Sequence, residues 1–497
     1  MDTAWTKTLF WVMTLLRRFL VISLVILGCC SISESQVFGA GELLWDEPIK
    51  IAGPGLINYP DLVVNQNGEV NFFYSQGTSE TSLDHAIYFR NFDGEMLSTP
   101  IDVLVTPGSV DARTPSAVLD QVGNVHVVWV GGTDIWYSRA VIAEAGNAAS
   151  WSKPTLLDGP TASNTRPALV LANGMELSLA YIIYGENPGI YVIESKNGGL
   201  TWEAPERVVD PQIEGLAPVS LSMCIDQLQG SKHIVWYEGD IYSNGLAAQE
   251  IYYIRQPGDL NSWADPDRFD SVSTGNYEDA YGPAMPSIAC NQSSIYIYWY
   301  GAPMGQRHFR YSLDHGENWR DIGQVSDFRG LTYPAALAFD RNGWLYVASG
   351  SLDNRLMFMV FDNQSWENGY PIDTNSMGPH YPRMVSENGK KLHVIWQEVI
   401  TNEIWYRQGV ISAIAELPTT PQGDVGAIEQ ALPTTPISSP TSLLVEENPI
   451  SPNIHASDST GTWKITPNDT ILFSSAAVLM VFVVVFIAIR FKIGSRS

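Results

Sequence analysis

Arginine, tyrosine and carboxylate side chains recur close to a series of prolines that mark off the central part of this chain. A guanidinium group binds a carboxylate through two parallel hydrogen bonds, so arginines that meet in one concave place suit the recognition of an acidic sugar. Phenol and carboxylate groups beside them would complete such a site. The candidate residues are Arg113, Arg166, Arg329, Arg383, Tyr333, Tyr381, Glu278 and Asp111.

The elements that would position these groups are short strands in a repeated unit. Each unit contains a proline, an apolar strand, a polar turn, a second apolar strand such as VHVVWV at 125–130, and two further strands. Turns such as Asn67-Gly68 and Asn342-Gly343 are strong hairpin signals, because glycine accepts a positive φ. Seven four-stranded units predict an all-β protein, a seven-bladed β-propeller over residues 43–412. The prolines are Pro60, Pro115, Pro167, Pro218, Pro286, Pro334 and Pro382.

The first and last strands of this repeat are out of step with each other. A strand at 45–51 precedes the first complete unit, whereas the last unit stops at Gly409 without an outer strand. We therefore expect strand 45–51 to complete the last blade, because an open sheet edge would otherwise be exposed. In such a ring the inner strands begin around the central axis, and the groups beside the prolines would converge on one mouth.

Two segments share the pattern Ser-x-Asp-x-Gly-x-Thr-Trp: Ser195–Trp202 (SKNGGLTW), which has Asn197 at the Asp position, and Ser312–Trp319 (SLDHGENW), which has Asn318 at the Thr position. Each is predicted to be a hairpin turn whose tryptophan covers apolar surface. The pattern resembles the Asp box of the sialidase superfamily, the bacterial neuraminidase repeat propellers. That resemblance implies a propeller with the box on the rim of a blade, away from the chemistry. Sialidases have six blades, so six is the alternative to the seven counted here.

The same resemblance implies roles for the candidate residues. Sialidases hold the substrate carboxylate with three arginines and use a tyrosine nucleophile assisted by a glutamate, with an aspartate as acid and base. Ala112-Arg113-Thr114-Pro115 resembles the family's Phe-Arg-Ile-Pro motif in keeping arginine two residues before proline. Tyr381 or Tyr333 would supply the phenol, and Glu278 and Asp111 the carboxylates. The implied activity is that of an exo-sialidase-type glycoside hydrolase.

A different class of function fits the same residues. Arginine and tyrosine near the start of a blade also form ion pairs and hydrogen bonds between neighbouring blades, and a fold does not determine a function. The alternative is therefore a non-catalytic propeller scaffold that binds a protein partner or a glycan at the cell surface. Tryptophans on strands, such as Trp129 and Trp396, are expected in the core rather than against sugars.

Composition excludes several other classes. The formal net charge of -25 argues against nucleic acid as a partner. The chain has no HExxH, CxxC, GxSxG or P-loop motif and no metal-ligand spacing among its eight histidines, so neither a cofactor nor a metal is predicted. Cys224 and Cys290 fall on predicted buried strands, where two separate thiols are favoured over a disulfide.

The two ends of the chain indicate export and membrane anchoring. Residues 1–36 combine basic residues with an apolar run, which is typical of a signal peptide or an N-terminal anchor; lipidation at Cys29 is the less favoured alternative. A Pro/Thr/Ser-rich stalk is expected at 415–468. The apolar segment 471–489 predicts a transmembrane helix, with 490–497 as a basic cytoplasmic tail. We expect a single-pass cell-membrane protein with its propeller outside and an extracellular glycan or glycoprotein as partner.

Overall fold

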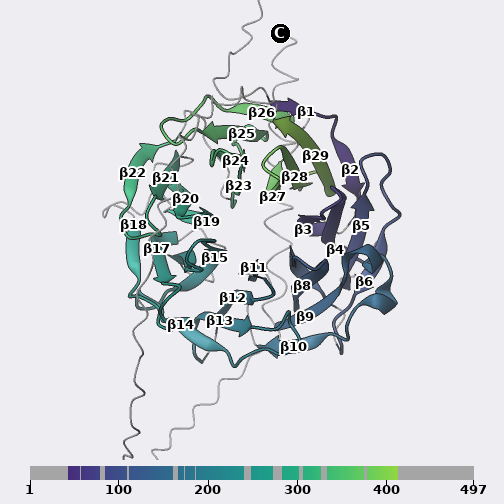
Figure 1. Ribbon diagram of the computed structural model, residues 1–497, viewed down its shortest axis with the longest axis horizontal. Coiled ribbons are helices and arrows are strands. Elements are labelled where there is room, and N and C mark those ends of the chain that lie inside the picture. The colour runs from purple at the N-terminus through teal and green to yellow at the C-terminus, as the bar shows by residue number, and fades with distance from the viewer. Residues whose placement is uncertain are drawn as a thin grey trace, which may run out of the picture. The chain divides into compact units, whose positions relative to one another are not determined.

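Seven antiparallel sheets form the folded part of the chain, and they stand in order around a central axis (Figure 1). The structure is a computed structural model that describes residues 43–55, 57–78, 84–108, 111–159, 166–172, 174–184, 186–239, 248–271, 283–301, 306–325, 333–373, 376 and 378–411. Each sheet is one blade, and its strands pair in sequence order from the axis outward. The predicted seven-bladed β-propeller is confirmed, and the six-bladed alternative is excluded.

The strands occupy four positions in each blade. The inner strands are β3 (Ile57–Val64), β7 (Arg113–Leu119), β11 (Ala168–Leu171), β15 (Ala217–Ile225), β19 (Ala284–Asn291), β23 (Ala336–Phe339) and β27 (Pro379–Glu387). The second strands are β4 (Val70–Gly77), β8 (Asn124–Gly131), β12 (Leu177–Ile183), β16 (Lys232–Gly239), β20 (Ser294–Gly301), β24 (Leu345–Gly350) and β28 (Lys391–Glu398). The third strands are β5 (His85–Phe92), β9 (Asp134–Val141), β13 (Gly189–Ser195), β17 (Ala248–Gln256), β21 (Gln306–Ser312), β25 (Leu356–Phe361) and β29 (Glu403–Ile411). The outer strands are β6 (Ile101–Leu104), β10 (Thr155–Asp158), β14 (Glu206–Val209), β18 (Asp267–Ser271), β22 (Arg320–Gln324) and β26 (Tyr370–Asp373), with β1 (Leu43–Trp45) and β2 (Ile49–Ala52) in the last blade. Two short 3-10 helices, η1 (Ile142–Glu144) and η2 (Ala148–Ser150), follow β9.

The ring is closed by the first two described strands. Leu43 in β1 pairs with Ile411, and Ile49 in β2 pairs with Tyr406, so both strands lie along β29 in the last blade. This arrangement confirms the expected closure by the N-terminal strand. It also joins the beginning and the end of the propeller through backbone hydrogen bonds, which leaves the third strand of the last blade paired on both sides.

The second strands form the core between the blades. Nearly every residue of β8, β12, β20 and β28 is buried. Trp129, Trp236 and Trp396 are fully buried, and Trp299 is 3% exposed, so these tryptophans belong to the core as predicted. The strands therefore read as continuous apolar runs because both faces of each blade are covered by a neighbouring blade.

The polar turns lie at one end of the propeller. Successive strands in a blade are antiparallel, so the turns between first and second strands share an end with those between third and fourth strands. We call this end the turn face. The inner strands begin at the opposite end, where the residues beside the prolines lie.

Three blades carry the same buried network at the turn face. It consists of a carboxylate, a histidine on the second strand and a tyrosine on the third, and we call this network a latch. In the second blade, His126 Nδ1 lies 2.8 Å from Tyr137 Oη and Nε2 lies 3.2 Å from Asp120 Oδ2. The other two latches are Asp226, His233 and Tyr253 in the fourth blade, and Glu387, His393 and Tyr406 in the last blade.

The two Ser-x-x-x-Gly-x-x-Trp turns each cover the latch of the preceding blade. The Trp202 ring lies edge-on to Tyr137 with centroids 4.9 Å apart, and the Trp319 ring lies 4.8 Å from Tyr253. Gly199 has φ +73°, and a Cβ there would lie 1.7 Å from Tyr137 Oη. Neither the positive φ nor the close approach leaves room for another residue, which explains glycine in the motif.

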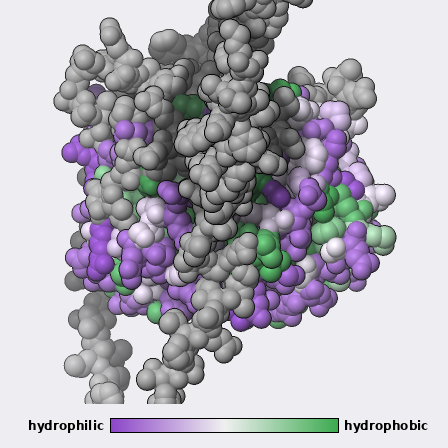
Figure 2. Space-filling model, turned by 90° about the horizontal axis from the view of Figure 1, so that it is seen from above, coloured by the Kyte–Doolittle hydropathy of each residue, from purple (hydrophilic) through white to green (hydrophobic). Residues whose placement is uncertain are grey.

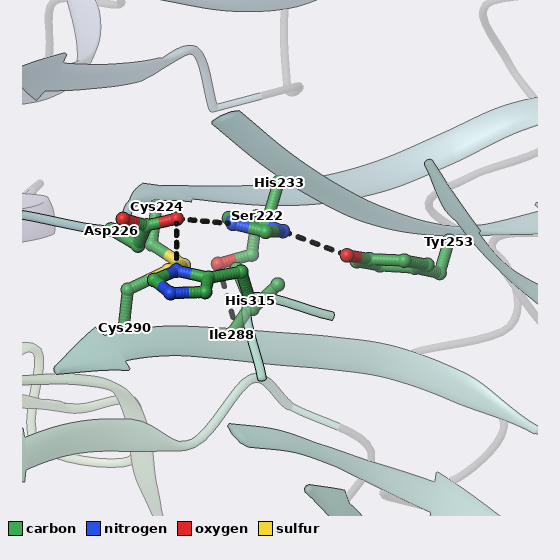
Figure 3. Close-up of a disulfide and its surroundings, with 8 residues drawn as sticks. All are labelled: Ser222, Cys224, Asp226, His233, Tyr253, Ile288, Cys290 and His315. Carbon is green, nitrogen blue, oxygen red and sulfur yellow. Dashed lines mark hydrogen bonds and ion pairs between the residues drawn. A yellow bond between two sulfur atoms is a disulfide. The ribbon is translucent and has the colours of Figure 1, made fainter. Parts of the chain in front are cut away.

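A disulfide joins the fourth and fifth blades beside the second of these turns. Cys224 on β15 is bonded to Cys290 on β19, so the prediction of two separate thiols was wrong. The physical reason is that the inner strands of neighbouring blades run side by side and bring the two positions within 5.7 Å, measured between Cα atoms. Figure 3 shows Asp226 between His233 and His315 next to this disulfide. His315 Nδ1 lies 3.2 Å from Asp226 Oδ2.

Several of the sequence-based predictions concern the two ends of the chain, which the structure does not describe. The N-terminal segment 1–36, the stalk 415–468, the helix 471–489 and the tail 490–497 all lie outside the described residues. Within the part of the chain that the structure describes, no helix is long and apolar enough to span a membrane. On the side that Figure 2 presents, hydrophilic residues cover much of the described surface and hydrophobic ones form separate patches.

Candidate functional site

The inner strands of four blades share an unusual backbone conformation at the end opposite the turn face. The residue before proline has a positive φ near 50° in each of them, although none is glycine. The strand ladder shifts register at the same point, which is the mark of a bulge. A non-glycine residue in this region of φ costs on the order of 1 kcal/mol, so the conformation persists only where its surroundings impose it. The residues are Tyr59, Thr114, Met285 and Tyr381.

Two of these bulges bring aromatic rings together. The Tyr59 and Tyr381 rings, from the first and last blades, have centroids 4.8 Å apart. Tyr333, just before the sixth blade, lies 5.4 Å from Tyr381 and 3.5 Å from His380 between ring centroids. Three phenols and one imidazole from three blades therefore meet at the beginning of the inner strands.

Asp61 is the centre of the charged part of this site. Arg166 Nη2, from the start of the third blade, lies 2.9 Å from Asp61 Oδ2, and Arg166 Nη1 donates to the backbone carbonyl of Pro60 at 3.3 Å. The same carboxylate accepts hydrogen bonds from the backbone N–H groups of Ala117 at 2.9 Å and Leu62 at 3.0 Å. One aspartate thus ties together the first three blades.

Arg383 stands beside this ion pair without a partner of its own. The positive charges of Arg383 and Arg166 interact with each other and with Asp61. Among the described residues, Arg383 makes no hydrogen bond or ion pair, and it is only partly buried. One carboxylate and two guanidinium groups leave a net positive charge here, although the chain as a whole carries -25. We call the set Tyr59, Asp61, Arg166, Tyr333, His380, Tyr381 and Arg383 the axial mouth.

The protonation states at the axial mouth follow from burial. Burial, together with the charge of Arg383, lowers the pKa of Arg166 to about 9, so Arg166 is still a cation at neutral pH. Burial lowers the pKa of His380 to about 4, so its imidazole is neutral there. Burial, followed by the neighbouring Tyr59 and Tyr333, raises the pKa of Tyr381. The charge of the site at neutral pH therefore comes from arginine and aspartate alone.

The structure brings together four of the predicted residues. Arg166, Arg383, Tyr333 and Tyr381 all belong to the axial mouth. Glu278 and Arg329 lie outside the described residues.

Asp111 and Arg113 form a pair at the start of the second blade. Arg113 Nε donates to Asp111 Oδ1 at 2.5 Å, and His85 Nδ1 lies 3.6 Å from the same oxygen. Asp111 is the sole partner of Arg113 within the described residues. The arginine that resembles the family motif is thus engaged by its own blade.

Asp61 is the residue that sequence reasoning missed. Apart from Arg383, the candidate residues were taken from the positions before each proline, whereas Asp61 directly follows Pro60. Arg383 directly follows Pro382 in the same way, so the two occupy equivalent positions in the first and last repeats. Aligning the repeats on the residue after proline would have placed both charges in one site.

Two buried carboxylates near the ends of second strands have structural roles. Glu238 on β16 accepts hydrogen bonds from the backbone N–H groups of Gln212 and Ile213 at 2.8 and 3.0 Å, and burial raises its pKa. Glu398 on β28 accepts from the Trp396 indole at 2.5 Å and from Ser376. Glu238 holds the connection between the third and fourth blades, so it is not free to act on a ligand.

Comparisons with known proteins do not name a family for this chain. No family model matches the chain, and no curated protein matches it. Similar solved structures include a protein of unknown function from Dyadobacter fermentans, with 14% identity, a TM-score of 0.44, and coverage of 74% of this chain and 99% of that one. They also include the NanB sialidase from Streptococcus pneumoniae, at 14% identity and a TM-score of 0.39 over 76% of this chain and 72% of that one. A polysaccharide lyase, an ulvan lyase, has 10% identity and a TM-score of 0.45 over 74% and 94% of the two chains.

These likenesses are too distant to assign an activity. The chain is a seven-bladed β-propeller protein by its own strand pairing. Its relation to the sialidase superfamily remains a prediction from the two turn motifs.

Proposed function

We propose that this protein recognises acidic carbohydrate at the axial mouth. The observation that carries the proposal is Arg383, a partly exposed guanidinium group with no ion pair among the described residues. It lies next to an aspartate that is already engaged by Arg166. A buried or half-buried cation that lacks a partner is unfavourable in the free protein, and a ligand carboxylate would supply that partner through two parallel hydrogen bonds.

The aromatic half of the axial mouth supports a sugar ligand. Tyr59, Tyr333 and Tyr381 present ring faces and hydroxyl groups within one cluster. Tyrosine suits such a site because it combines a large apolar surface with a polar tip, and a sugar has both C–H faces and hydroxyl groups. The charge and the rings together favour a sugar that carries a carboxylate as the ligand.

The described geometry supports recognition more than hydrolysis. A tyrosine nucleophile must lose its proton to a nearby base, and no described carboxylate contacts Tyr381. Burial and the neighbouring phenols raise the pKa of Tyr381, which makes ionisation harder. A more specific version of the proposal is that the protein is an exo-sialidase. This activity requires a carboxylate such as Glu278 to reach Tyr381.

The proposal places the protein at the cell surface on sequence grounds. The apolar segments at 1–36 and 471–489 support export and a single membrane span, with the stalk 415–468 between the span and the propeller. An extracellular glycan or glycoprotein is then the natural source of an acidic sugar.

The test is glycan binding by the full-length protein in detergent. Oligosaccharides that end in N-acetylneuraminic acid or glucuronic acid are compared with the same oligosaccharides lacking the terminal acid. We expect selective binding to the acidic forms and at least about a tenfold loss of affinity in Arg383→Met, since a hydrogen bond to a charged group contributes about 1.5–3 kcal/mol.

The matched control is Arg268→Met, which removes an arginine on the outer strand β18 that pairs with Glu250. It should leave binding unchanged. Equal binding of acidic and neutral glycans, or full affinity in Arg383→Met, would reject recognition at the axial mouth. Release of a fluorogenic sialoside aglycone that is abolished in Tyr381→Phe would add hydrolysis to recognition.

A further inference from the structure

Asn363 begins a sequence pattern that the axial mouth does not use. Asn363-Gln364-Ser365 has the form Asn-x-Ser, in which x is not proline, and this tripeptide is the acceptor for N-linked glycans in exported proteins. The same tripeptide occurs at Asn291-Gln292-Ser293, and a related one, Asn468-Asp469-Thr470, lies outside the described residues. Asn363 lies between β25 and β26, and Asn291 ends β19, so both belong to the turn face.

The turn that carries Asn363 presents the pattern at the surface. Asp362 Oδ1 accepts hydrogen bonds from the backbone N–H groups of Gln364 at 2.8 Å and Ser365 at 2.7 Å, which fixes the turn. Asn363 itself has a φ of 73°, a left-handed conformation that asparagine tolerates. Gln364 and Ser365 are both exposed. The Ser365 hydroxyl makes no hydrogen bond among the described residues, so the hydroxyl that the pattern requires is available.

The carboxamide of Asn363 has its oxygen toward the protein and its nitrogen toward solvent. Tyr296, a buried tyrosine on β20 of the fifth blade, donates from its hydroxyl to Asn363 Oδ1 at 2.7 Å. Asn363 Nδ2 makes no hydrogen bond within the described residues, and it does not belong to their buried polar atoms that lack one, so it reaches solvent. An N-linked sugar replaces one hydrogen on this nitrogen and leaves the oxygen as a carbonyl. The hydrogen bond from Tyr296 is therefore compatible with the modification.

The same tripeptide in the fifth blade has less room. Asn291 Nδ2 lies against the turn of the sixth blade, because a Cβ on Gly343 would be 3.1 Å from it. A glycan on Asn291 would have to pass that turn. Of the two patterns in the described part of the chain, the one at Asn363 is therefore the better acceptor.

We propose that Asn363 carries an N-linked oligosaccharide. The co-reactant is an oligosaccharide joined through C1 to the phosphate of a membrane lipid, and a membrane-bound transferase supplies the catalysis. The reaction forms a bond between Asn363 Nδ2 and that C1, breaks the bond between C1 and a phosphate oxygen, and releases the lipid phosphate and one proton from Nδ2. The glycan projects from the turn face, at the end of the blades opposite the axial mouth, so access to the mouth is unchanged.

This inference rests on the export proposed above. The Cys224–Cys290 disulfide supports export independently of the apolar segments at the two ends of the chain. Disulfides form and persist in oxidising compartments outside the cytosol, and N-linked glycans are added to proteins on the same route.

The test is peptide mass spectrometry of the full-length protein, purified from the membranes of cells that produce it naturally. We expect a peptide that carries an oligosaccharide, with fragmentation that places the sugar on Asn363. Ser365→Ala removes the required hydroxyl without touching the bond from Tyr296, and it should abolish the attachment. Ser365→Thr keeps a hydroxyl and should retain the attachment. Both variants should bind acidic glycans at the axial mouth as the wild type does.

Two controls separate this outcome from the export on which it rests. Alkylation of thiols before reduction shows whether Cys224 and Cys290 are joined in the same sample, and Asn291→Gln should leave the glycan on Asn363 in place. An unmodified Asn363 in protein whose disulfide has formed overturns the inference and leaves export standing, whereas an unmodified Asn363 together with free thiols overturns both. A sugar that persists in Ser365→Ala also rejects the inference, because its attachment would not depend on the pattern.

Discussion

At the turn face, the carboxylate of Asp226 lies between the imidazoles of His233 and His315, and the Tyr253 hydroxyl meets the far side of His233 (Figure 3). At the axial mouth, Asp61 is shared by Arg166 and by backbone N–H groups, and Arg383 stands beside them without an ion pair within the described residues. Both regions are built from carboxylates, bases and tyrosines at the ends of strands. They differ in whether the network is complete.

The difference indicates what each region does. The latch of the fourth blade is covered by Trp319 and lies beside the Cys224–Cys290 disulfide, and its carboxylate also accepts hydrogen bonds from His315 and the Gln229 backbone, so its groups are satisfied within the protein. Such a closed network contributes to stability. The axial mouth retains strained tyrosines and a cation, Arg383, that has no ion pair among the described residues; both lower stability and are expected where a ligand completes the set. Mutations should therefore separate the regions, with stability effects at the turn face and binding effects at the mouth.

The largest expected loss of stability is at the disulfide. Replacing both cysteines in Cys224→Ser/Cys290→Ser should lower the free energy of unfolding by about 4 kcal/mol, because the bond closes a loop with a sequence separation of 66 residues. Chemical denaturation of the full-length protein, with and without reductant, measures this loss. Reductant should destabilise the wild type and have no further effect on the variant. An unchanged denaturation midpoint would mean that blades four and five are held together without the bond.

The tryptophans of the two turns should come next. Trp202→Ala and Trp319→Ala should each cost about 3 kcal/mol, because each removes a ring that packs on a latch tyrosine. Trp319 also contacts Phe269 at 4.7 Å, so its loss is expected to be the larger of the two. Thermal unfolding of both variants gives the comparison. Wild-type Tm values in both variants would show that the two turns do not stabilise the propeller.

Lowering the pH should reduce the stability that the latches contribute before it changes the protonation of the axial mouth. Burial lowers the pKa of His126, His233 and His393 in the folded protein. A histidine that resists protonation when folded contributes stability above its unfolded pKa of about 6.5, and that contribution is lost as the pH falls toward the lowered value. Burial alone would raise the pKa of Asp226, but hydrogen bonds from His233, Gln229 and His315 outweigh it and hold that pKa below its usual range.

The measurement is Tm between pH 7.5 and pH 5. We expect Tm to fall below about pH 6.5, and to fall less steeply in His233→Gln, which has one such histidine fewer. A Tm that rises on acidification, or an identical slope in the variant, would contradict the proposed role of the latch.

The smallest effect on stability is expected at the axial mouth. Arg383→Met removes a cation that has no ion pair among the described residues, so the free energy of unfolding should not fall by more than about 0.5 kcal/mol. The same substitution should abolish selectivity for acidic glycans. A large loss of stability would show that Arg383 holds the blades together, and the contrast between the two regions would disappear.

Much of the fold could be predicted from sequence because each blade is a local unit. Alternating apolar strands and Asn-Gly turns, such as Asn342-Gly343, need only near neighbours in the chain to form a hairpin. Counting the units predicted seven blades, and the unmatched strand at 45–51 predicted the closure by β2. Arg166 lies beside Arg383 and Tyr333 beside Tyr381, as a converging ring would require, but their role in a site stays a prediction.

The contacts between blades could not be predicted in the same way. Asp61 meets Arg166 across the start of three blades, and Cys224 meets Cys290 across two, because residues far apart in sequence are brought together only when the ring closes. The hydrogen bonds that decide which arginine is paired depend on bulges at Tyr59 and Tyr381, and propensity does not reveal a positive φ at tyrosine.

The sequence by itself determined the class of fold, the number of blades and the residue types gathered at the axis, because strand periodicity and turn chemistry act over a few residues. Only the tertiary structure decided which of those groups are satisfied and which are left unpaired. The physical reason is that a hydrogen bond or an ion pair depends on distances of a few ångströms between blades, and the closing of the ring sets those distances.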